Sequence, residues 1–260
     1  MTALLIVTAF AGIYASEAGI KTDHTGKITF IDKDGYVISE LKPHSEERIY
    51  DTSGASLSVV TRAYASAGKK YAAVFRTVYS TRGAPGSFSD IIEAELSLLY
   101  DNGETRWKKK NIAPYPEFNL CFARNETRLM VAAKDPDAET PKVKAIIIFN
   151  ANGSEAWRSE EFGAPGYMKL SPNGKFASFS YTRDVKDSRG AVSQEYGCVF
   201  VDVDKKRINQ YRLPPGADRA VPNVTDQGKC IVTVIKPEKV GDFKVKQIEE
   251  VLYEYTFSPY

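Results

Sequence analysis

Few residues of this chain have the types and spacing that catalysis or metal binding requires. There are two histidines, His24 and His44, and each lies in a polar segment without a recognisable catalytic or metal-binding motif around it. No serine lies in the glycine-flanked turn that exposes a nucleophile. We therefore identify no catalytic residue, and we expect neither a metal site nor a cofactor.

Acidic residues form two closely spaced pairs that could do chemistry. Asp32 and Asp34 precede Gly35 as in part of a calcium-binding loop, but the remaining acidic ligands are not at the required spacing. A hairpin turn explains this pair better. Glu93 and Glu95 alternate along one strand, so they share a face, whereas the carboxylates of a glycoside hydrolase face each other across a cleft.

The three cysteines, Cys121, Cys198 and Cys230, do not form a disulfide framework. Their number is odd, no pair has the Cys-x-x-Cys spacing, and all three lie in apolar stretches that read as strands. We predict that they are buried thiols that pack as small hydrophobic side chains. One disulfide with a third, free thiol is the alternative.

The overall charge argues against one class of partner. The chain has 35 basic and 33 acidic side chains, which leaves a net charge of +2. Binding to nucleic acid through neutralisation of phosphates is therefore not expected. The 260 residues are 43% hydrophobic, which is enough to bury a sizeable core. After the N-terminus, no segment is long and apolar enough for a membrane-spanning helix.

The N-terminal segment, residues 1–18, has two interpretations. Thr2 to Ala15 carries no charge and has the length of the apolar region of a signal peptide, and Ser16 and Ala18 fit a cleavage site. No Lys or Arg precedes this run, so a buried first strand is the alternative. A signal peptide predicts a periplasmic or secreted protein, and a first strand predicts a cytoplasmic one.

A repeated motif indicates how the rest of the chain is organised. "LLYDNGETRW" ends at Trp107 and "IFNANGSEAW" ends at Trp157, and the turn glycines Gly103 and Gly153 are 50 residues apart. Asn-Gly is favoured in tight hairpin turns because these turns require positive φ angles. A large aromatic residue on the returning strand can pack one unit against the next.

The whole chain after residue 19 reads as short strands separated by turns. The strands are rich in Val, Ile, Tyr, Phe and Thr, and equivalent turns recur at 66–70, 124–128, 171–175 and 225–229. Four strands per 40–50 residues are typical of a β-propeller blade. We predict an all-β fold in which residues 19–260 form one small β-propeller domain of four-stranded antiparallel blades.

The number of blades is four or five. Complete units are expected at 55–110, 118–160 and 166–213, with a three-stranded unit at 219–257 and a two-stranded hairpin at 27–42. The hairpin either completes the last blade, which gives four blades, or begins a blade of its own. An open arc that is closed by a partner chain is the third option.

Some of these motifs resemble those of known propeller families. "DNGETRW" and "NANGSEAW" resemble the tryptophan-docking repeat of PQQ-type propellers, and "YMKLSPNGKFASFSY" at 167–181 resembles the repeat of TolB-type propellers. The blades are also similar to WD repeats. The resemblance covers residues 55–257 and implies a propeller, without selecting one family. PQQ-type dehydrogenases use about eight blades and a calcium-holding pocket, and this chain is too short for that, so no cofactor is implied.

The loops between the second and third strands of the predicted blades would share one face of the propeller. These loops are long, at about 80–90, 134–142, 182–194 and 236–246. Long loops on a rigid scaffold are where binding residues gather, although the same loops could be plain solvated connections. The binding residues predicted from them are Arg82, Lys134, Asp135, Arg183, Asp184 and Lys236.

These observations favour a non-catalytic, extracytoplasmic module that binds a protein or a glycan through the long-loop face. The alternative is a propeller enzyme, a hydrolase or lyase that cleaves glycans with carboxylates at the mouth of the channel. Two carboxyl groups facing each other about 5–10 Å apart would favour the enzyme. A cytoplasmic scaffold is the third hypothesis, and it requires residues 1–18 to be a strand.

Overall fold

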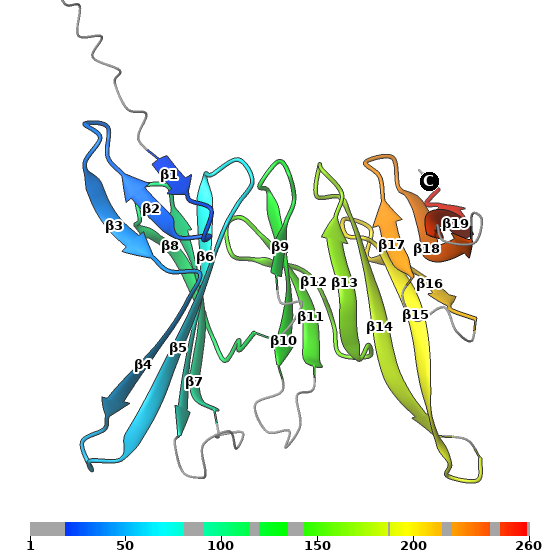
Figure 1. The fold of residues 1–260 in the computed structure, drawn as a ribbon, viewed down its shortest axis with the longest axis horizontal. Helices are drawn as coiled ribbons and strands as arrows, with labels where there is room; N and C mark the ends of the chain where they lie inside the picture. The colour runs from blue at the N-terminus through cyan, green and yellow to red at the C-terminus, as the bar shows by residue number, and fades with distance from the viewer. Residues whose placement is uncertain are drawn as a thin grey trace, which may run out of the picture.

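The computed structural model describes residues 19–80, 91–114, 120–134, 143–186, 188–214, 220–239 and 245–258. These residues form nineteen β-strands and no helix, in five antiparallel sheets (Figure 1). In this part of the chain, therefore, no helix is present that could span a membrane. The predicted all-β fold is confirmed. The N-terminal segment 1–18 lies outside the described residues, so both interpretations of it stay predictions.

Sheets A and B form the N-terminal part. In sheet A the strand order is β1 (Gly19–Thr22), β2 (Ile28–Ile31) and β3 (Val37–Leu41). Sheet B consists of β4 (His44–Tyr50), β5 (Ser56–Ala65), β6 (Tyr71–Ser80), β7 (Ile91–Tyr100) and β8 (Thr105–Lys110). Each sheet has one strand more than the sequence predicted. The additional strand β4 is mostly exposed and reads "HSEERIY", so it lacks the apolar alternation that would have marked it.

Sheets C, D and E follow the predicted units. Sheet C contains β9 (Leu120–Phe122), β10 (Arg128–Lys134), β11 (Val143–Asn150) and β12 (Glu155–Ser159). Sheet D contains β13 (Ala164–Leu170), β14 (Phe176–Lys186), β15 (Val192–Asp202) and β16 (Arg207–Arg212). Sheet E contains β17 (Val221–Val224), β18 (Lys229–Lys239) and β19 (Val245–Thr256). In every sheet the strands pair in chain order, as in the blades of a propeller.

The predicted turns have the backbone that hairpins require. Gly103 and Gly153 have φ angles of 81° and 86°, in the left-handed region that glycine adopts without steric cost. Where the corresponding turn has no glycine, a polar residue takes this conformation: φ is 60° at Glu126 and 53° at Lys206. Such residues cost more in a left-handed conformation, and this is why the sequence signal was weaker at these turns.

Four clusters of buried side chains pack the sheets face to face, each between two consecutive sheets. Alternation along the strands sends neighbouring residues into different clusters: on β10, Val131 packs toward sheet B and Met130 toward sheet D. The B–C cluster includes Phe75, Leu96, Leu98, Leu129 and Phe149. The C–D cluster includes Met130, Ile146, Ile148, Phe179 and Tyr181. A single sheet could not bury both of its faces, so the stack is needed for a stable core.

The two tryptophans dock on the following sheet, as predicted. The indole Nε1 of Trp107 on β8 donates a hydrogen bond to the carbonyl of Ala151, 3.0 Å away. A Cβ atom at Gly153 would lie 2.9 Å from Cγ of Trp107, so the turn must be glycine for the indole to approach it. Trp157 on β12 packs on Phe179 of sheet D, with ring centroids 6.1 Å apart. The repeated motif is therefore a repeated contact between sheets.

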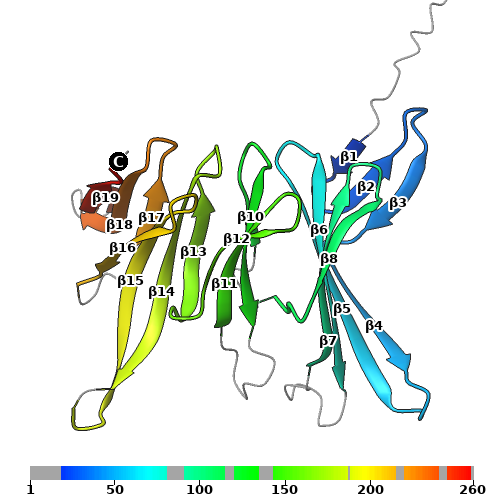
Figure 2. The ribbon, with the colours of Figure 1, turned by 180° about the vertical axis from the view of Figure 1, so that it is seen from behind.

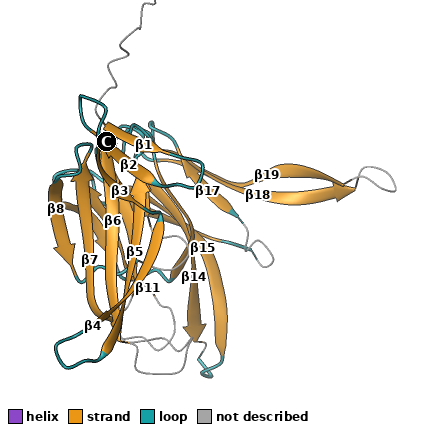
Figure 3. Ribbon diagram, turned by 60° about the vertical axis from the view of Figure 1, so that its left-hand side comes forward, coloured by secondary structure: helices purple, strands orange, loops and turns teal. Residues whose placement is uncertain are grey.

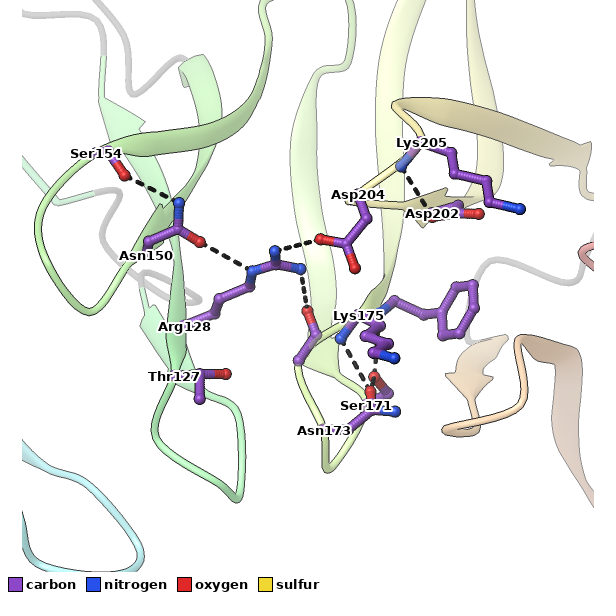
Figure 4. A network of polar contacts seen from close by, with 12 residues as sticks. Thr127, Arg128, Asn150, Ser154, Ser171, Asn173, Lys175, Asp202, Asp204 and Lys205 are labelled. Carbon is purple, nitrogen blue, oxygen red and sulfur yellow. Dashed lines mark hydrogen bonds and ion pairs between the residues drawn. The ribbon is translucent and has the colours of Figure 1, made fainter. Parts of the chain in front are cut away.

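Arg128 connects sheets C and D by polar contacts (Figure 4). From β10, its Nε donates to Oδ1 of Asn150 on β11 at 3.0 Å, and its Nη1 donates to the carbonyl of Gly174 in the β13–β14 turn at 2.8 Å. Its Nη2 forms an ion pair with Asp204 in the β15–β16 turn. One largely buried guanidinium thus holds two turns of the neighbouring sheet.

Turns also contact turns along the stack. The backbone N–H of Asn125, between β9 and β10, donates to the carbonyl of Pro172 at 2.9 Å. The backbone N–H of Asn173 in turn donates to Oδ1 of Asp226, between β17 and β18, at 2.7 Å. Equivalent turns of sheets C, D and E are therefore linked in sequence order.

The five sheets are arranged in chain order across the molecule, with A and B at one end and E at the other (Figures 1 and 2). In sheet E the β18–β19 hairpin projects away from the body (Figure 3). Within the described residues, no buried cluster contains side chains of both sheet A and sheet E. The architecture is propeller-like in its blades and their stacking, and the number of blades and the closure of the ring stay predictions.

Candidate functional site

The β14–β15 hairpin points, with the β4–β5 hairpin, toward the end of the molecule at the bottom of Figure 1, which we call the long-loop end. The β18–β19 hairpin projects in another direction (Figure 3), so the predicted loops at 182–194 and 236–246 do not share one face. Both of these predicted loops are largely strand. β14 and β15 pair without interruption from Phe176↔Asp202 to Lys186↔Val192, and β18 and β19 pair as far as Lys239↔Val245. In the β14–β15 hairpin the residues at this end are mostly polar and mostly exposed. A strand without a buried face has no alternation of apolar residues, and for this reason the sequence suggested a loop at 182–194.

The structure describes some of the predicted binding residues and not others, and it places those that it describes in different environments. Arg82 and Asp135 lie outside the described residues, and Lys236 is described by its backbone, which pairs with Ile248 in the β18–β19 hairpin. Lys134 is buried at the end of β10, and burial lowers the pKa of its ammonium group. A buried lysine at this position is a correction to the predicted solvent-exposed loop residue.

Arg183 and Asp184 are neighbours on β14, so their side chains point to opposite faces of sheet D. Asp184 is exposed, and its backbone pairs with that of Gln194. Arg183 lies on the face that also carries Tyr181 and packs against sheet C. The structure therefore does not bring these two predicted residues together, and Arg183 is the one around which other polar side chains gather.

Arg183 is held by Glu195, its partner in the register of β14 and β15. Its Nε and Nη2 donate to Oε1 of Glu195 at 2.9 and 2.7 Å. Its guanidinium carbon lies 5.5 Å from the centroid of the Tyr181 ring. Residues directly opposite each other on paired strands have adjacent side chains, so the strand register creates this ion pair.

Three more side chains complete the arrangement, which we call the Glu195 cluster: Tyr181, Arg183, Glu195, Gln210 and Arg212. The Tyr181 hydroxyl donates to Oε1 of Glu195 at 2.9 Å, and the Gln210 amide donates to that hydroxyl. From β16, Nε of Arg212 lies 3.3 Å from Oε2 of Glu195. Both oxygens of the carboxylate are therefore occupied, and two guanidinium groups flank it.

Tyr181 is the most deeply buried member of the cluster. Its ring lies over Gly197, where a Cβ atom would be 2.5 Å from the ring atoms, and packs against Phe162 at a centroid distance of 5.3 Å. Burial, together with the hydrogen bond to the carboxylate of Glu195, raises the pKa of the Tyr181 hydroxyl above its ordinary value. Tyr181 is therefore a protonated hydrogen-bond donor, enclosed by protein.

Exposure differs sharply within the cluster. The side chain of Glu195 is 7% exposed, whereas those of Arg183 and Arg212 are 38% and 71% exposed. One carboxylate and two guanidinium groups leave a net charge of +1. The negative charge is thus enclosed and the positive charges reach the solvent. Guanidinium groups stay protonated in proteins, so this surface attracts anions at any physiological pH.

The other acidic residues considered as sites have structural partners. Oδ1 of Asp32 accepts hydrogen bonds from the backbone N–H groups of Asp34 and Tyr36, which confirms the predicted hairpin turn. Glu93 pairs with Arg76 at 3.4 Å, and Glu95 pairs with Lys108 at 3.0 Å, which lowers the pKa of Glu95. In the described part of the chain, no group of three or more His, Cys, Asp or Glu side chains could hold a metal ion.

The cysteines are free thiols. Cys198 and Cys230 are completely buried between sheets D and E, as predicted, and Cys121 is partly buried beside the C–D cluster. Burial raises the pKa of the Cys198 and Cys230 thiols to about 12. Because the thiolate is the reactive form, neither is a candidate nucleophile.

Sequence reasoning missed four members of the Glu195 cluster: Tyr181, Glu195, Gln210 and Arg212. The spacing of Tyr181 and Arg183 is a usable signal, since residues two apart on a strand share a face. Gly197, two residues after Glu195, is another, since a glycine inside a strand often marks a close approach. The register that joins β14, β15 and β16 is a tertiary property, and no local pattern revealed it.

No protein family and no curated protein sequence matches the chain. Among solved structures, it is similar to the acylaminoacyl peptidase of Pyrococcus horikoshii, with a TM-score of 0.45 and 8% identity over 71% of this chain and 31% of the peptidase. It is also similar to the hydrazine synthase of Kuenenia stuttgartiensis (TM-score 0.34, 12% identity, 80% of this chain and 70% of that one). A third similarity is to XC5397 of Xanthomonas campestris, a gluconolactonase (TM-score 0.35, 14% identity, 80% and 75%). Similarities of this size assign no activity, and this chain spans less than a third of the peptidase.

Proposed function

We propose that this chain is a non-catalytic, extracytoplasmic binding module that engages a protein or a glycan through its long-loop end. The observation that carries the proposal is the Glu195 cluster, in which an enclosed carboxylate holds two solvent-facing guanidinium groups. Recognition sites are commonly built from side chains that a rigid scaffold fixes before the ligand arrives. Sheet D supplies such a scaffold at this end.

The chemistry of the cluster suits binding better than catalysis. A general acid or base must be able to exchange a proton with the substrate. Here the carboxylate of Glu195 is neutralised by two guanidinium groups, and the hydroxyl of Tyr181 is enclosed. What remains for a ligand is a fixed positive surface with N–H donors, which recognises charge and does not transfer protons.

Exposed apolar side chains at the same end support the proposal. Ile49 and Tyr50 lie at the end of β4, Ile92 near the start of β7, and Val192 at the start of β15. Exposed apolar side chains on a protein surface are typical of protein interfaces. We include in the proposed face three other residues predicted from the long loops, Arg82, Asp135 and Asp184, and leave out the buried Lys134 and Lys236 of the projecting β18–β19 hairpin.

The proposed location rests on the uncharged apolar run from Thr2 to Ala15. It is tested by expressing the full chain in a secreting host and sequencing the N-terminus of the product. A mature chain that begins near Gly19 supports an extracytoplasmic protein. An intact N-terminus on a chain that stays in the cytoplasm would refute this part of the proposal.

The face is tested by trimming one hairpin. Replacing residues 185–193 with Asn-Gly keeps the Arg183–Glu195 pair and removes the outer end of the β14–β15 hairpin. The parent, the trimmed variant and a control are applied to peptide and glycan arrays. The control is Lys175→Gln, in a turn at the opposite end, which removes one positive charge as the trimming does. We expect the trimmed variant alone to lose signals; unchanged signals would exclude the outer end of the β14–β15 hairpin from the binding face.

A further inference from the structure

Strand β4 is a free edge of sheet B. It pairs with β5 on one side, and no described strand lies along its other side (Figure 1). Six of its seven residues are exposed. The unpaired N–H and C=O groups of an edge strand are a template for pairing with another chain, so β4 is open to a strand from outside the molecule.

Hydrogen bonds at its two ends show which way the backbone of β4 points. The carbonyl of Pro43 accepts from the N–H of Ala63 on β5 at 3.1 Å, and the N–H of Asp51 donates to the carbonyl of Ala55 at 3.0 Å. Backbone groups alternate in direction along a strand, so the odd-numbered residues of β4 point to β5. The even-numbered residues therefore direct their N–H and C=O groups to the free edge: His44, Glu46, Arg48 and Tyr50.

The side chains along this edge match those of the same strand in a second copy. In a two-fold symmetric antiparallel pair, edge-facing residues must lie opposite edge-facing residues. A pair centred on Glu47 meets this condition and places Glu46 opposite Arg48 of the second copy, twice by symmetry. Opposite charges at directly opposed positions stabilise paired strands. Glu47 lies opposite its own counterpart, which is a like-charge contact.

Both members of the expected ion pair are available for a partner. In the described residues, Arg48 is exposed and has no acidic partner. Glu46 is also exposed, and its Oε1 accepts a hydrogen bond from the hydroxyl of Ser58 at 2.7 Å. Its second carboxylate oxygen is left for a guanidinium group, so the pairing breaks no ion pair within the chain.

Two other edge strands lack this match. Strand β8 ends in the lysines 108–110, and β19 carries Glu249, Glu250 and Glu254. A second copy of either strand would meet like charges, and charged side chains are a common protection of sheet edges. We infer that two copies of this chain pair through β4, which joins their five-stranded sheets B into one sheet across a two-fold axis.

The inference goes beyond the proposed function and does not depend on it. Strand β4 and the β14–β15 hairpin lie toward opposite ends of the row of sheets, so the pairing leaves that hairpin exposed (Figures 1 and 2). Of the exposed apolar residues of the proposed face, Ile49 and Tyr50 belong to the paired strand, whereas Ile92 and Val192 do not. If both proposals hold, a dimer presents two hairpins and gains avidity for a ligand with repeated epitopes.

The first test is sedimentation velocity of the full chain over a range of about 1–200 μM, where weak interfaces associate. A seven-residue edge is a small interface, so we expect a weak dimer whose share rises with concentration. A parent chain that stays monomeric over the whole range would overturn the inference.

Charge reversal tests the register. Glu46→Arg and Arg48→Glu each turn both ion pairs into like-charge contacts, so we expect each variant alone to dimerise roughly tenfold or more weakly. A mixture of the two variants again has opposite charges across the interface, so we expect a heterodimer with about the affinity of the parent. Heterodimer formation also shows that both variants are folded. Single variants that dimerise as the parent does, or a mixture that stays monomeric, would overturn the inference.

Arg158→Glu is the matched control. Arg158 lies on β12, an edge strand of sheet C, and is 38% exposed. Its reversal changes the net charge by the same amount as Arg48→Glu, so dimerisation within twofold of the parent is expected. Equal losses in the two variants would overturn the inference, because they would reveal an effect of net charge.

Glu47→Gln provides a test in the opposite direction. The substitution removes the like-charge contact at the centre of the pair, so we expect dimerisation to tighten roughly twofold to fivefold. The same sedimentation measurement detects this gain. A dimer that is unchanged or weakened by Glu47→Gln would overturn the proposed register, and the inference with it.

Discussion

At the scale of single residues, Tyr181 joins the core of the molecule to the Glu195 cluster. Its ring belongs to the C–D cluster, and its hydroxyl donates to Glu195 and accepts from Gln210. An aromatic residue with a polar end can link an apolar layer to a polar site. The fixed geometry of Arg183 therefore depends on core packing as well as on its ion pair.

The ionisation of Tyr181 gives a pH-dependent prediction. Its pKa is raised above the ordinary 10.0, chiefly by burial. Above pH 10 the unfolded chain therefore loses this proton more readily than the folded one, so stability falls as pH rises. Below pH 10, we expect Tyr181→Phe to cost about 1–2 kcal/mol through the lost hydrogen bonds. The difference between parent and variant should shrink above pH 10.

Urea unfolding of both proteins between about pH 8 and pH 11 measures this difference. The other tyrosines and the lysines ionise in both proteins, so their contributions cancel. A stability difference that is constant over this range would show that Tyr181 has the same pKa in the folded and unfolded states.

Gly197 is predicted to be intolerant of any side chain. A Cβ atom there would lie 2.5 Å from the Tyr181 ring, and no flexible end can move aside because the ring is buried. We expect Gly197→Ala to cost about 1–3 kcal/mol by overpacking. In a Tyr181→Ala background the same change should cost far less, and a double-mutant cycle measures the difference. Equal costs in the two backgrounds would mean that the ring is not the obstacle.

At the scale of elements, the sheets are held together by repeated contacts between turns and faces. Arg128 is the clearest polar example, since it reaches Asn150 within sheet C and both Gly174 and Asp204 in sheet D. The contacts to Asn150, Gly174 and Asp204 come from three separate nitrogens of a planar group, and the single nitrogen of lysine cannot occupy all three positions. The sheet junction thus needs the shape of arginine as well as its charge.

We predict that Arg128→Met destabilises the protein by about 1.5–3 kcal/mol, the range for hydrogen bonds to charged groups. Arg128→Lys should recover less than half of this loss. Chemical denaturation of the three proteins checks the order, with Arg158→Met as a control on the exposed side of the same sheet. If Arg128→Lys were as stable as the parent, charge alone would hold the junction.

Local sequence patterns predicted most of the strands and turns. Features that depend on tertiary structure could not be predicted from them. The turns around Gly103 and Gly153 and the docking of Trp107 follow from hairpin chemistry and from the repeat. Strand β4 and the outer part of the β14–β15 hairpin were missed because strands without a buried face carry no apolar alternation. In the candidate site, Arg183 was predicted, but its partner Glu195 is a consequence of strand register.

At the scale of the whole molecule, packing connects each sheet only to its neighbours in the described residues. Stability in such an array is a sum of units and of interfaces between neighbours. Sheets B, C and D have a buried cluster on both faces, whereas in the described residues sheets A and E have one each. Unfolding is therefore expected to begin at the ends of the array.

Native-state hydrogen exchange tests this expectation. We predict the slowest exchange for the amides of β10, β11, β14 and β15 near the core, and exchange at least tenfold faster for β1–β3 and β19. Peptide-level mass spectrometry distinguishes these segments. Uniform protection across all five sheets would indicate instead one cooperative unit, as a closed ring would produce.

The β14–β15 hairpin continues beyond the C–D cluster as a two-stranded ribbon whose outer residues pair mainly with each other. Substitutions in that ribbon do not change the packing between the sheets. Many protein folds likewise carry functional sites that can change without changing the fold. Natural selection can therefore revise what this molecule recognises without endangering its ability to fold. Descendants of this gene are expected to diverge fastest along the outer ribbon and slowest at positions such as Gly197.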